Sequence, residues 1–501
     1  MGFDALLVRM QELKDLAGLV ALATWDEQTY LPPLGSPGRG HQLAALSAVL
    51  HERLVDPALG DLLESAASLP SDELPGAMVR VLSRDRRRAL NVPPDLVRAL
   101  AQAQSRGLAA WHAARHARSF ALFAPALKEL LDLRREQANA IGHQGEPYDA
   151  LLDGYEPGMT VARLDPVLTR LKERLVPMVQ ALAAARPPPD VLAGRRFDAA
   201  GQWRFARLLL EQMGFQFDAG RLDPSIHPFS CASHPRDVRL TTRVDETQLW
   251  PAVFATLHEG GHGLYAQGLP EALHRTPLAT APSAGLDESQ SRLWENGLGK
   301  SRHFWTYFFP RLQQHLPQSL GDITEEGFYG AIHRVTPGSA RGGADEVTYN
   351  LHIILRYELE RLLMRDALPL EDLPREWNRR THQLLGVTPP DDNAGVLQDI
   401  HWSAGDLGYF PTYALGNLYA ASLLRALRQG VTDLDARLAQ GELSGATQWL
   451  RENVYVHGAR YDAEELVRRV CGHGLRDDDF LVQLADKYGE LYGVSLAPAR
   501  A

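Results

Sequence analysis

Apolar side chains recur at intervals of three and four residues along most of this 501-residue chain. The first such run is Leu6, Leu7, Met10, Leu13, Leu16, Ala17 and Val20. This spacing places the apolar side chains on one face of an α-helix, which must bury that face against a neighbour. Similar runs lie at 122–140, 164–185, 202–213, 417–428 and 463–472. The chain is therefore predicted to be mainly α-helical.

One segment departs from the helical pattern. Residues 237–244, Asp-Val-Arg-Leu-Thr-Thr-Arg-Val, alternate apolar or β-branched side chains with other residues. Alternation with a period of two is typical of a half-buried β-strand. The preceding His-Pro-Phe at 227–229 is predicted to form a turn that leads into this strand. A small β-sheet is therefore expected within the helical fold.

Proline- and glycine-rich breakers separate the helical runs at 31–38, 186–190 and 389–393. The three prolines at 187–189 are the best candidate for a boundary, although they indicate a turn rather than a flexible linker. Length alone suggests about three domains of ~150 residues each. Because no long linker or repeat supports that division, we predict one large helical unit, with two lobes as the alternative.

Composition excludes several classes of protein. Apolar residues make up 45% and charged residues 23%, so the chain has enough apolar surface to fold and is not disordered. The net charge of 52 − 62 = −10 disfavours nucleic acid or an anionic membrane as a partner. Cys231 and Cys471 are too few for a disulfide framework or a thiolate zinc cluster. We find neither a signal peptide nor a membrane-length apolar stretch and expect a cytoplasmic, soluble protein.

The strongest chemical signal is His-Glu-Gly-Gly-His at 258–262. Residues four positions apart share one face of a helix, so His258 and His262 can bind the same metal ion. Glu259 is offset by about 100° and can reach a water molecule on that ion. Flanking apolar residues predict a buried helix, in which unpartnered histidines would be costly. This HExxH pattern is typical of zinc hydrolases, and about 0.04 copies are expected by chance in a chain of this length.

A catalytic zinc ion usually has three protein ligands and one open position. A new helical pattern begins at Asp-Glu-Ser-Gln at 287–290, and Glu288 in its first turn is our candidate for the third ligand. Asp287 and Glu295 are alternatives, although each is also explained as a helix-start charge or part of a solvated face. Position 268 is Gly, so the third histidine of the metzincin pattern is absent.

Two features of the motif allow other interpretations. Glu259–His262 is also an ExxH pair, as in di-iron helical bundles, but its only counterpart, Glu271–His274, directly follows a proline. Each Gly in a helix costs about 1 kcal/mol relative to Ala. We expect Gly260 and Gly261 to permit close approach of another helix or of substrate; the alternative is a frayed helix without a metal.

Motifs along nearly the whole chain resemble the carboxypeptidase Taq family of metallocarboxypeptidases. They lie at 25–29, 148–152, 155–158, 227–229, 237–241, 258–262, 288–291, 344–353 and 401–413. The resemblance implies a large two-lobed helical fold around a substrate groove, similar to neurolysin and angiotensin-converting enzyme, with the small sheet at the active site. Motifs so far apart that converge on one site indicate a single catalytic domain over 1–501.

The resemblance also implies an activity and its cofactor. It implies zinc-dependent removal of single C-terminal residues from peptides with broad specificity, with cobalt as an alternative metal and a homodimer as the assembly. It makes Glu288 the third metal ligand. Two positions depart from the family pattern: Gly260 stands where Phe is common, and Asp287 stands where His is common. Both departures are expected to change packing or hydrogen bonding around the ligands.

An enzyme that cleaves at the C-terminus must recognise a carboxylate, and arginine suits that geometry. Three arginines lie within the matched motifs or beside them: Arg239, Arg341 and Arg356. We favour Arg341 for the substrate carboxylate, and the resemblance makes Arg239 a residue that closes the groove. Arg356 shares a polar helical face with Tyr349 and His352, which suggests the wall of a cleft. A structural ion pair is the alternative for each arginine.

The predicted mechanism needs a base and donors for the tetrahedral oxyanion. Glu259 is the predicted general base. His401 and Tyr409 are similar to the His and Tyr that hold the oxyanion in neurolysin-like enzymes, with Tyr413 as the alternate donor and core packing as the alternative role. Two rival functions remain: a peptidase that cuts elsewhere, as an endopeptidase or dipeptidyl carboxypeptidase, and a catalytically inactive peptide-binding protein.

Overall fold

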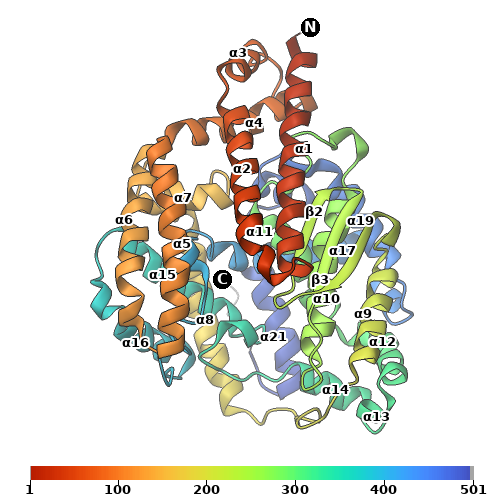
Figure 1. The fold of residues 1–501 in the computed structure, drawn as a ribbon. Helices are drawn as coiled ribbons and strands as arrows, with labels where there is room; N and C mark the ends of the chain where they lie inside the picture. The colour runs from red at the N-terminus through yellow and green to blue at the C-terminus, as the bar shows by residue number, and fades with distance from the viewer. Residues whose placement is uncertain (1, 497–501) are drawn as a thin grey trace. The chain divides into compact units, whose positions relative to one another are not determined.

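A computed structural model describes residues 2–496 and confirms the mainly helical fold with a small sheet (Figure 1). The chain forms two compact units, each assembled from three separate stretches of sequence. The first unit comprises Met1–Leu90, Val191–Tyr329 and Tyr419–Gly474, and the second Asn91–Asp190, Gly330–Leu418 and Leu475–Ala501. One boundary between units falls between Asp190 and Val191, one residue after the proline run at 187–189.

Each predicted helical run coincides with a helix, apart from one or two residues at an end. The first unit contains α1 (Gly2–Thr29), α2 (Ser36–Val55), α3 (Pro57–Ser65), α9 (Ala199–Met213), α10 (Trp250–Gly268), α11 (Ala284–Arg292), α12 (Arg302–His315), α13 (Pro317–Leu320), α18 (Leu434–Leu438), α19 (Ser444–Asn453) and α20 (Ala463–Cys471). The second contains α5 (Pro94–Ala117), α6 (Ala124–Ile141), α7 (Pro147–Tyr155), α8 (Val161–Ala184), α15 (Tyr349–Met364), α16 (Leu373–Leu385) and α21 (Asp478–Tyr492). A boundary between units falls within α4 (Leu74–Asn91), α14 (Glu325–Ile332) and α17 (Pro411–Gly430).

The sheet of the first unit has three strands in the order β1-β3-β2. The predicted strand is the central one, β3 (Asp237–Thr242), and it ends two residues earlier than expected. It pairs in parallel with β1 (Gly220–Pro224) and antiparallel with β2 (Ser230–His234), neither of which was predicted. A Cβ atom added at Gly263 of α10 would lie 3.0 Å from the Leu240 side chain. The sheet therefore packs directly against the helix that carries the HExxH motif.

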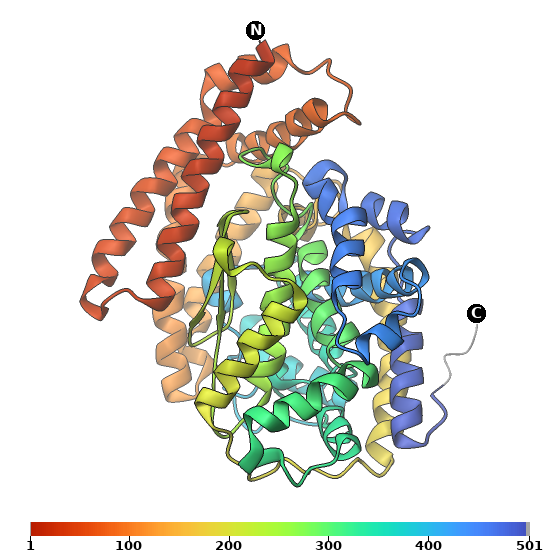
Figure 2. The ribbon, with the colours of Figure 1, turned by 90° about the vertical axis from the view of Figure 1, so that its right-hand side faces the viewer.

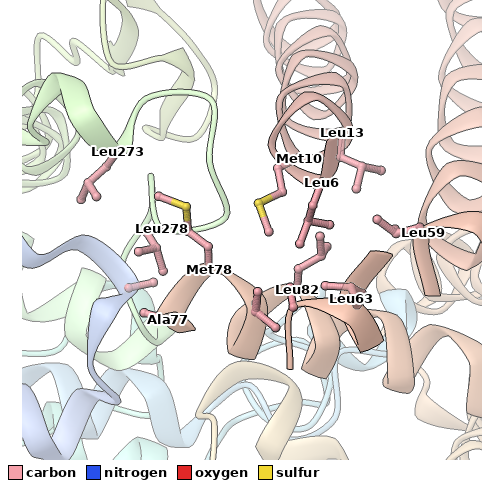
Figure 3. Packing of buried hydrophobic residues seen from close by; sticks show 13 residues of the cluster. Leu6, Met10, Leu13, Leu59, Leu63, Ala77, Met78, Leu82, Leu273 and Leu278 are labelled. Carbon is pink, nitrogen blue, oxygen red and sulfur yellow. The ribbon is translucent and has the colours of Figure 1, made fainter. Parts of the chain in front are cut away.

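The N-terminal helices pack on the connection between α10 and α11. Figures 1 and 2 show α1 and α2 side by side at the N-terminal, red end of the colour range. Figure 3 shows buried side chains that converge from α1, α3, α4 and this connection: Leu6, Met10, Leu13, Leu59, Leu63, Ala77, Met78, Leu82, Leu273 and Leu278. The predicted stripe of α1 is thus buried at three positions and only partly buried at the others.

The second unit combines long helices with an irregular segment. Large side chains such as Tyr148, Tyr357 and Trp377 are fully buried in it. Between α16 and α17 the chain is largely irregular and contains only the short helix η8 (His401–Ala404). Within residues 2–496, no helix is both long and apolar enough to cross a membrane.

Candidate metal centre

Helix α10 presents both histidines of the HExxH motif to one carboxylate. Oε2 of Glu288 lies 3.7 Å from Nε2 of His258 and 3.7 Å from Nε2 of His262. All three candidate ligand atoms lie within 4.8 Å of one another. A tetrahedral ion with bonds of about 2.0–2.2 Å separates its ligand atoms by roughly 3.3–3.6 Å. Two imidazole nitrogens and a carboxylate oxygen at these distances fit a metal ion.

Glu288 is positioned by the start of α11 and by Arg292 one turn later. The N-cap Ser283 side chain accepts a hydrogen bond from Leu286 N at 3.0 Å. Nε of Arg292 donates to Oε1 of Glu288 at 2.8 Å, which leaves Oε2 directed at the histidines. Burial acts to raise the pKa of Glu288, but Arg292 and the two histidines hold it well below its usual range. The carboxylate is therefore ionised, as a metal ligand must be.

The two other acidic candidates contact the opposite nitrogens of the rings. The Glu295 carboxylate accepts from Nδ1 of His258 at 2.9 Å, and Asp287 lies 3.2 Å from Nδ1 of His262. A carboxylate on one imidazole nitrogen orients the ring and makes the other nitrogen a better ligand. Glu295 belongs to the π-helical turn Leu293–Leu298, a distortion that is frequent at functional sites. The structure thus brings Glu288, rather than Asp287 or Glu295, to the two Nε2 atoms.

Glu259 is buried beside the ligands, with 6% of its surface exposed. Burial raises the pKa of its carboxyl above the ordinary value, although the neighbouring histidines act to lower it. A buried carboxylate with a raised pKa accepts a proton more readily than an exposed one. These features are compatible with the predicted role of Glu259 as a general base.

The two glycines of the motif serve different contacts. A Cβ atom at Gly261 would lie 2.5 Å from the carbonyl oxygen of Gln290 and 2.7 Å from Cα of Ser291. The prediction of close approach of another helix is therefore confirmed for Gly261, with α11 as that helix. A Cβ atom at Gly260 would instead meet side-chain ends of α9, at 2.7 Å from Met213 and 2.8 Å from Leu210. These side chains fill the space beside the position where the resembled family commonly has Phe.

The di-iron interpretation lacks a second metal-binding helix among the described residues. Glu271 lies in the short 3₁₀ helix η4 (Glu271–Leu273), and His274 directly follows it. Nε2 of His274 lies 3.1 Å from the carbonyl oxygen of Leu269, so a backbone group already occupies this ring nitrogen.

In the second unit, one aspartate joins two of the predicted arginines. Asp399 contacts Arg341 through Oδ1, at 2.9 Å from Nε, and Arg356 through Oδ2, at 2.6 Å from Nε. The Arg356 side chain is fully buried, whereas that of Arg341 is 15% exposed. Nη1 of Arg341 also lies 3.2 Å from the hydroxyl of Tyr349. Asp399 is not among the residues predicted from the sequence; its place two residues before His401, where a matched motif begins, was the available signal.

The three predicted oxyanion donors lie together in the second unit. Nε2 of His401 is 3.2 Å from the hydroxyl of Tyr413. The ring of Tyr409 packs edge to face on Tyr413 with centroids 5.2 Å apart, and its centroid lies 5.6 Å from that of His401. Burial, followed by the charge of Arg341, lowers the pKa of His401 to about 4, so the imidazole is neutral near pH 7.

Arg239 belongs to the first unit and has local partners. Its guanidinium binds Asp237 through two contacts, at 2.9 and 3.1 Å. It also lies over the ring of Trp25 in α1, at 4.3 Å from the centroid. Trp25 and Asp237 both fall in matched motifs, and the cation–π contact links these two motifs physically.

Comparisons with known proteins agree with this geometry. The carboxypeptidase Taq (M32) metallopeptidase family matches residues 5–488. Thermostable carboxypeptidase 1 of Thermus thermophilus is 42% identical over 98% of this chain and 99% of that protein. Carboxypeptidase 1 of Bacillus subtilis is 35% identical over 96% and 97% of the two chains. The crystal structure of an M32 carboxypeptidase from Deinococcus radiodurans R1 has a TM-score of 0.95 and 38% identity, over 98% of this chain and 100% of that one.

The sequence match and the structural match each extend over nearly the whole chain. The predicted family resemblance is therefore confirmed, and with it the expectation of a peptide-hydrolysing enzyme. A metallopeptidase requires a metal ion, and the first unit offers two histidines and a glutamate that fit one. The chain belongs to the carboxypeptidase Taq (M32) family and is a metallocarboxypeptidase.

Proposed function

We propose that this enzyme uses zinc to remove single C-terminal residues from peptides with broad specificity, and that cobalt can replace zinc. The observation that carries the proposal is the convergence of His258, His262 and Glu288 within 4.8 Å. Two histidines and one glutamate, with a fourth position left open, form the ligand set of zinc peptidases such as thermolysin. The hydrogen bond between Glu295 and Nδ1 of His258 adds the outer support that such ligands usually have, and Asp287 lies within ion-pair distance of Nδ1 of His262.

A metal ion held by these residues supplies Lewis acidity, which polarises the scissile carbonyl and lowers the pKa of a water molecule. Glu259 follows His258 in the sequence and takes the proton from the attacking water. The same carboxyl then delivers that proton to the leaving amine. Its buried position and raised pKa support this role.

His401 and Tyr409 are proposed to donate hydrogen bonds to the oxyanion. Their roles rest on the resemblance of residues 401–413 and on the contacts of their rings. Because the imidazole of His401 is neutral near pH 7, it donates from one nitrogen only. Tyr413 contacts Nε2 of this ring, so we propose that it orients His401 and is the alternate donor.

Arg341 is proposed to bind the substrate carboxylate. Arg341 and Arg356 share the single carboxylate of Asp399, so this group carries an excess charge of 2 − 1 = +1. Burial lowers the pKa of His352 to about 3, so this histidine adds no charge near pH 7. A peptide carboxylate would neutralise the excess, and Arg341 is the more exposed of the two arginines.

The remaining predicted arginines receive indirect roles. Arg356 is fully buried, and we propose that it acts on substrate only through Asp399. We propose that Arg239 limits the length of bound peptide together with Trp25, a role that rests on the resemblance of residues 237–241.

We propose that both units act as one catalytic domain with peptides as substrates. Homodimeric assembly stays a prediction that rests on the resemblance. Cytoplasmic location stays a prediction as well; Cys231 and Cys471 are both unbridged, which fits a reducing compartment.

Mass spectrometry of peptide digests tests the proposed activity. We expect ladders that shorten by one residue at a time from the C-terminus and stop when a chelator removes the metal. An amidated C-terminus should block cleavage, because Arg341 would lose its carboxylate partner. Internal cuts or release of dipeptides would instead support an endopeptidase or a dipeptidyl carboxypeptidase, and absence of any cleavage by the metal-loaded protein would support a binding protein.

A further inference from the structure

A buried carboxylate of the second unit has no part in the mechanism so far. Glu360 of α15 is fully buried and accepts three hydrogen bonds. The indole N–H of Trp402 donates to Oε1 at 2.7 Å, while the hydroxyl of Tyr148 and the backbone N–H of Gly408 donate to Oε2 at 2.7 and 3.1 Å. All three donors are uncharged, so hydrogen bonds rather than an ion pair hold this carboxylate.

Such a carboxylate is expensive to bury, because neutral donors replace only part of its hydration. Burial raises the pKa of Glu360 to about 7, although the three hydrogen bonds act to lower it. A well-packed apolar side chain would fill the same space at a lower cost. The carboxylate therefore calls for an explanation other than stability.

Two of the three donors to Glu360 lie at the two ends of one irregular segment. Trp402 directly follows His401, and Gly408 directly precedes Tyr409. Gly408 has φ +89°, and a Cβ atom there would lie 2.9 Å from Leu152 N, so only glycine suits this position. Glu360 thus connects, through one carboxylate, the residues next to both proposed oxyanion donors.

The middle of the same segment is fixed by two other helices. The Gln104 side chain of α5 donates to the carbonyl oxygen of Ala404 at 2.8 Å. The Arg134 side chain of α6 donates to the carbonyl oxygen of Gly405 at 2.9 Å. Glu360 accepts the N–H groups at the ends, whereas α5 and α6 bind carbonyls in the middle. The Tyr413 side chain also contacts both His401 and Tyr409, but it touches their rings, whereas Glu360 binds the N–H groups of the residues next to them.

We propose that Glu360 is a positioning residue that sets the places of His401 and Tyr409 relative to each other. This inference rests on the proposed function, in which those two side chains hold the oxyanion. A carboxylate suits the task because each oxygen can accept from one end of the segment. A carboxamide offers only one acceptor atom, so glutamine cannot hold both ends.

Steady-state kinetics of Glu360→Gln tests the inference. We expect kcat to fall by about 10- to 100-fold, the size of effect that a displacement near 1 Å produces at a reacting group. KM should stay within about twofold, because Arg341 and not this segment is proposed to bind the substrate carboxylate. The matched control is Glu358→Gln on the same helix, whose carboxylate binds Lys172 and Arg380 outside the segment. This control should retain the wild-type kcat.

A spectroscopic measurement gives a second readout that a general loss of stability would not produce. In enzyme labelled with 5-fluorotryptophan, the ¹⁹F resonance of Trp402, assigned with Trp402→Phe, should titrate near pH 7 as Glu360 takes up a proton. The other groups that face Glu360 are Tyr148, whose pKa burial raises well above its ordinary value, and Arg356. Both keep their protons at this pH. In Glu360→Gln the titration should be absent.

The outcomes separate this inference from the proposed function. A kcat that falls in Tyr409→Phe and His401→Gln but not in Glu360→Gln overturns the inference alone. An unchanged kcat in Tyr409→Phe and His401→Gln overturns the oxyanion roles and the inference together. If Glu360→Gln does not fold, Trp402→Phe replaces it in the kinetic test, since it removes one end of the connection; a wild-type kcat in that variant also overturns the inference.

Discussion

Substitution of Gly261 by alanine tests how closely α10 and α11 must approach to form the metal centre. The added Cβ atom would lie 2.5 Å from the carbonyl oxygen of Gln290, whereas ordinary contacts begin at 3.4 Å. Relief of this overlap requires α11 to move by 3.4 − 2.5 = 0.9 Å. The neighbouring atoms belong to the backbone, so no side-chain rotation can absorb the displacement.

The expected loss of metal affinity follows from how small an error in ligand position a metal site tolerates. Metal–ligand distances must match their ideal values within about 0.2 Å, and the expected displacement is several times larger. Glu288 lies on α11, so its Oε2 atom would leave the position from which it reaches both histidines. We expect metal affinity to fall by about 10- to 100-fold, or ~1.4–2.8 kcal/mol. By its helix propensity alone, alanine would stabilise α10 by about 1 kcal/mol relative to glycine. Weaker metal binding in spite of this higher helix propensity is therefore the result that would identify the overlap with α11 as the cause.

Competition between the protein and a fluorescent zinc chelator measures this affinity directly. The matched control is Gly260→Ala in the same turn, whose Cβ atom meets only the side-chain ends of Met213 and Leu210. Those ends can rotate, so the control should bind zinc within twofold of the wild type. If Gly261→Ala binds zinc as tightly as Gly260→Ala, the close approach of the two helices does not determine the site.

Three further substitutions test the assigned roles. Glu259→Gln should retain zinc affinity but lower kcat by about 10²–10⁴-fold, measured by chelator competition and peptide hydrolysis; near-wild-type turnover would remove it as the base. Arg341→Met should raise KM by about 10- to 100-fold, the loss of one charged hydrogen-bonded contact, and equal KM values would exclude its contact with the carboxylate. Asp287→Asn should weaken zinc binding by about tenfold through His262, and unchanged affinity would show that this contact does not support the ligand.

The sequence predicted elements whose stability is encoded locally. The stripes of α6, α8 and α9 each bury their own face, and β3 alternates along its own length. Strands β1 and β2 have five residues each and lack such a pattern, and their hydrogen bonds come from pairing with β3. β2 ends only two residues before β3 begins, but both outer strands depend on pairing with β3, which an apolar period within each short strand does not report.

The residues of the candidate site also fall into those that local spacing predicts and those that only the structure places. The i, i+4 spacing of His258 and His262 is a property of one helix, so the sequence alone placed them together. Glu288 and Glu295 are seven residues apart and therefore share a face, which left both open as ligands. The structure separates them because Glu288 reaches the Nε2 side of the histidines and Glu295 the Nδ1 side of one. Arg292 donates to both carboxylates, at 2.8 Å to Glu288 and 3.1 Å to Glu295, a contact that was not predicted from the sequence.

Arg341 and Arg356 show why the charge around each site must be considered separately from the net charge of the protein. An overall charge of −10 gives no hint of a group that binds a carboxylate. In the second unit, Asp399 pairs with two guanidinium groups, of which that of Arg356 is wholly buried and that of Arg341 is partly exposed, so Arg341 is the one that we propose for the substrate carboxylate. A second carboxylate beside Arg341 would cancel the excess positive charge of this group, and loss of Asp399 would leave Arg356 buried without its partner. Under this proposal, Asp399 compensates the buried charge of Arg356 while the partly exposed Arg341 can still accept an anion.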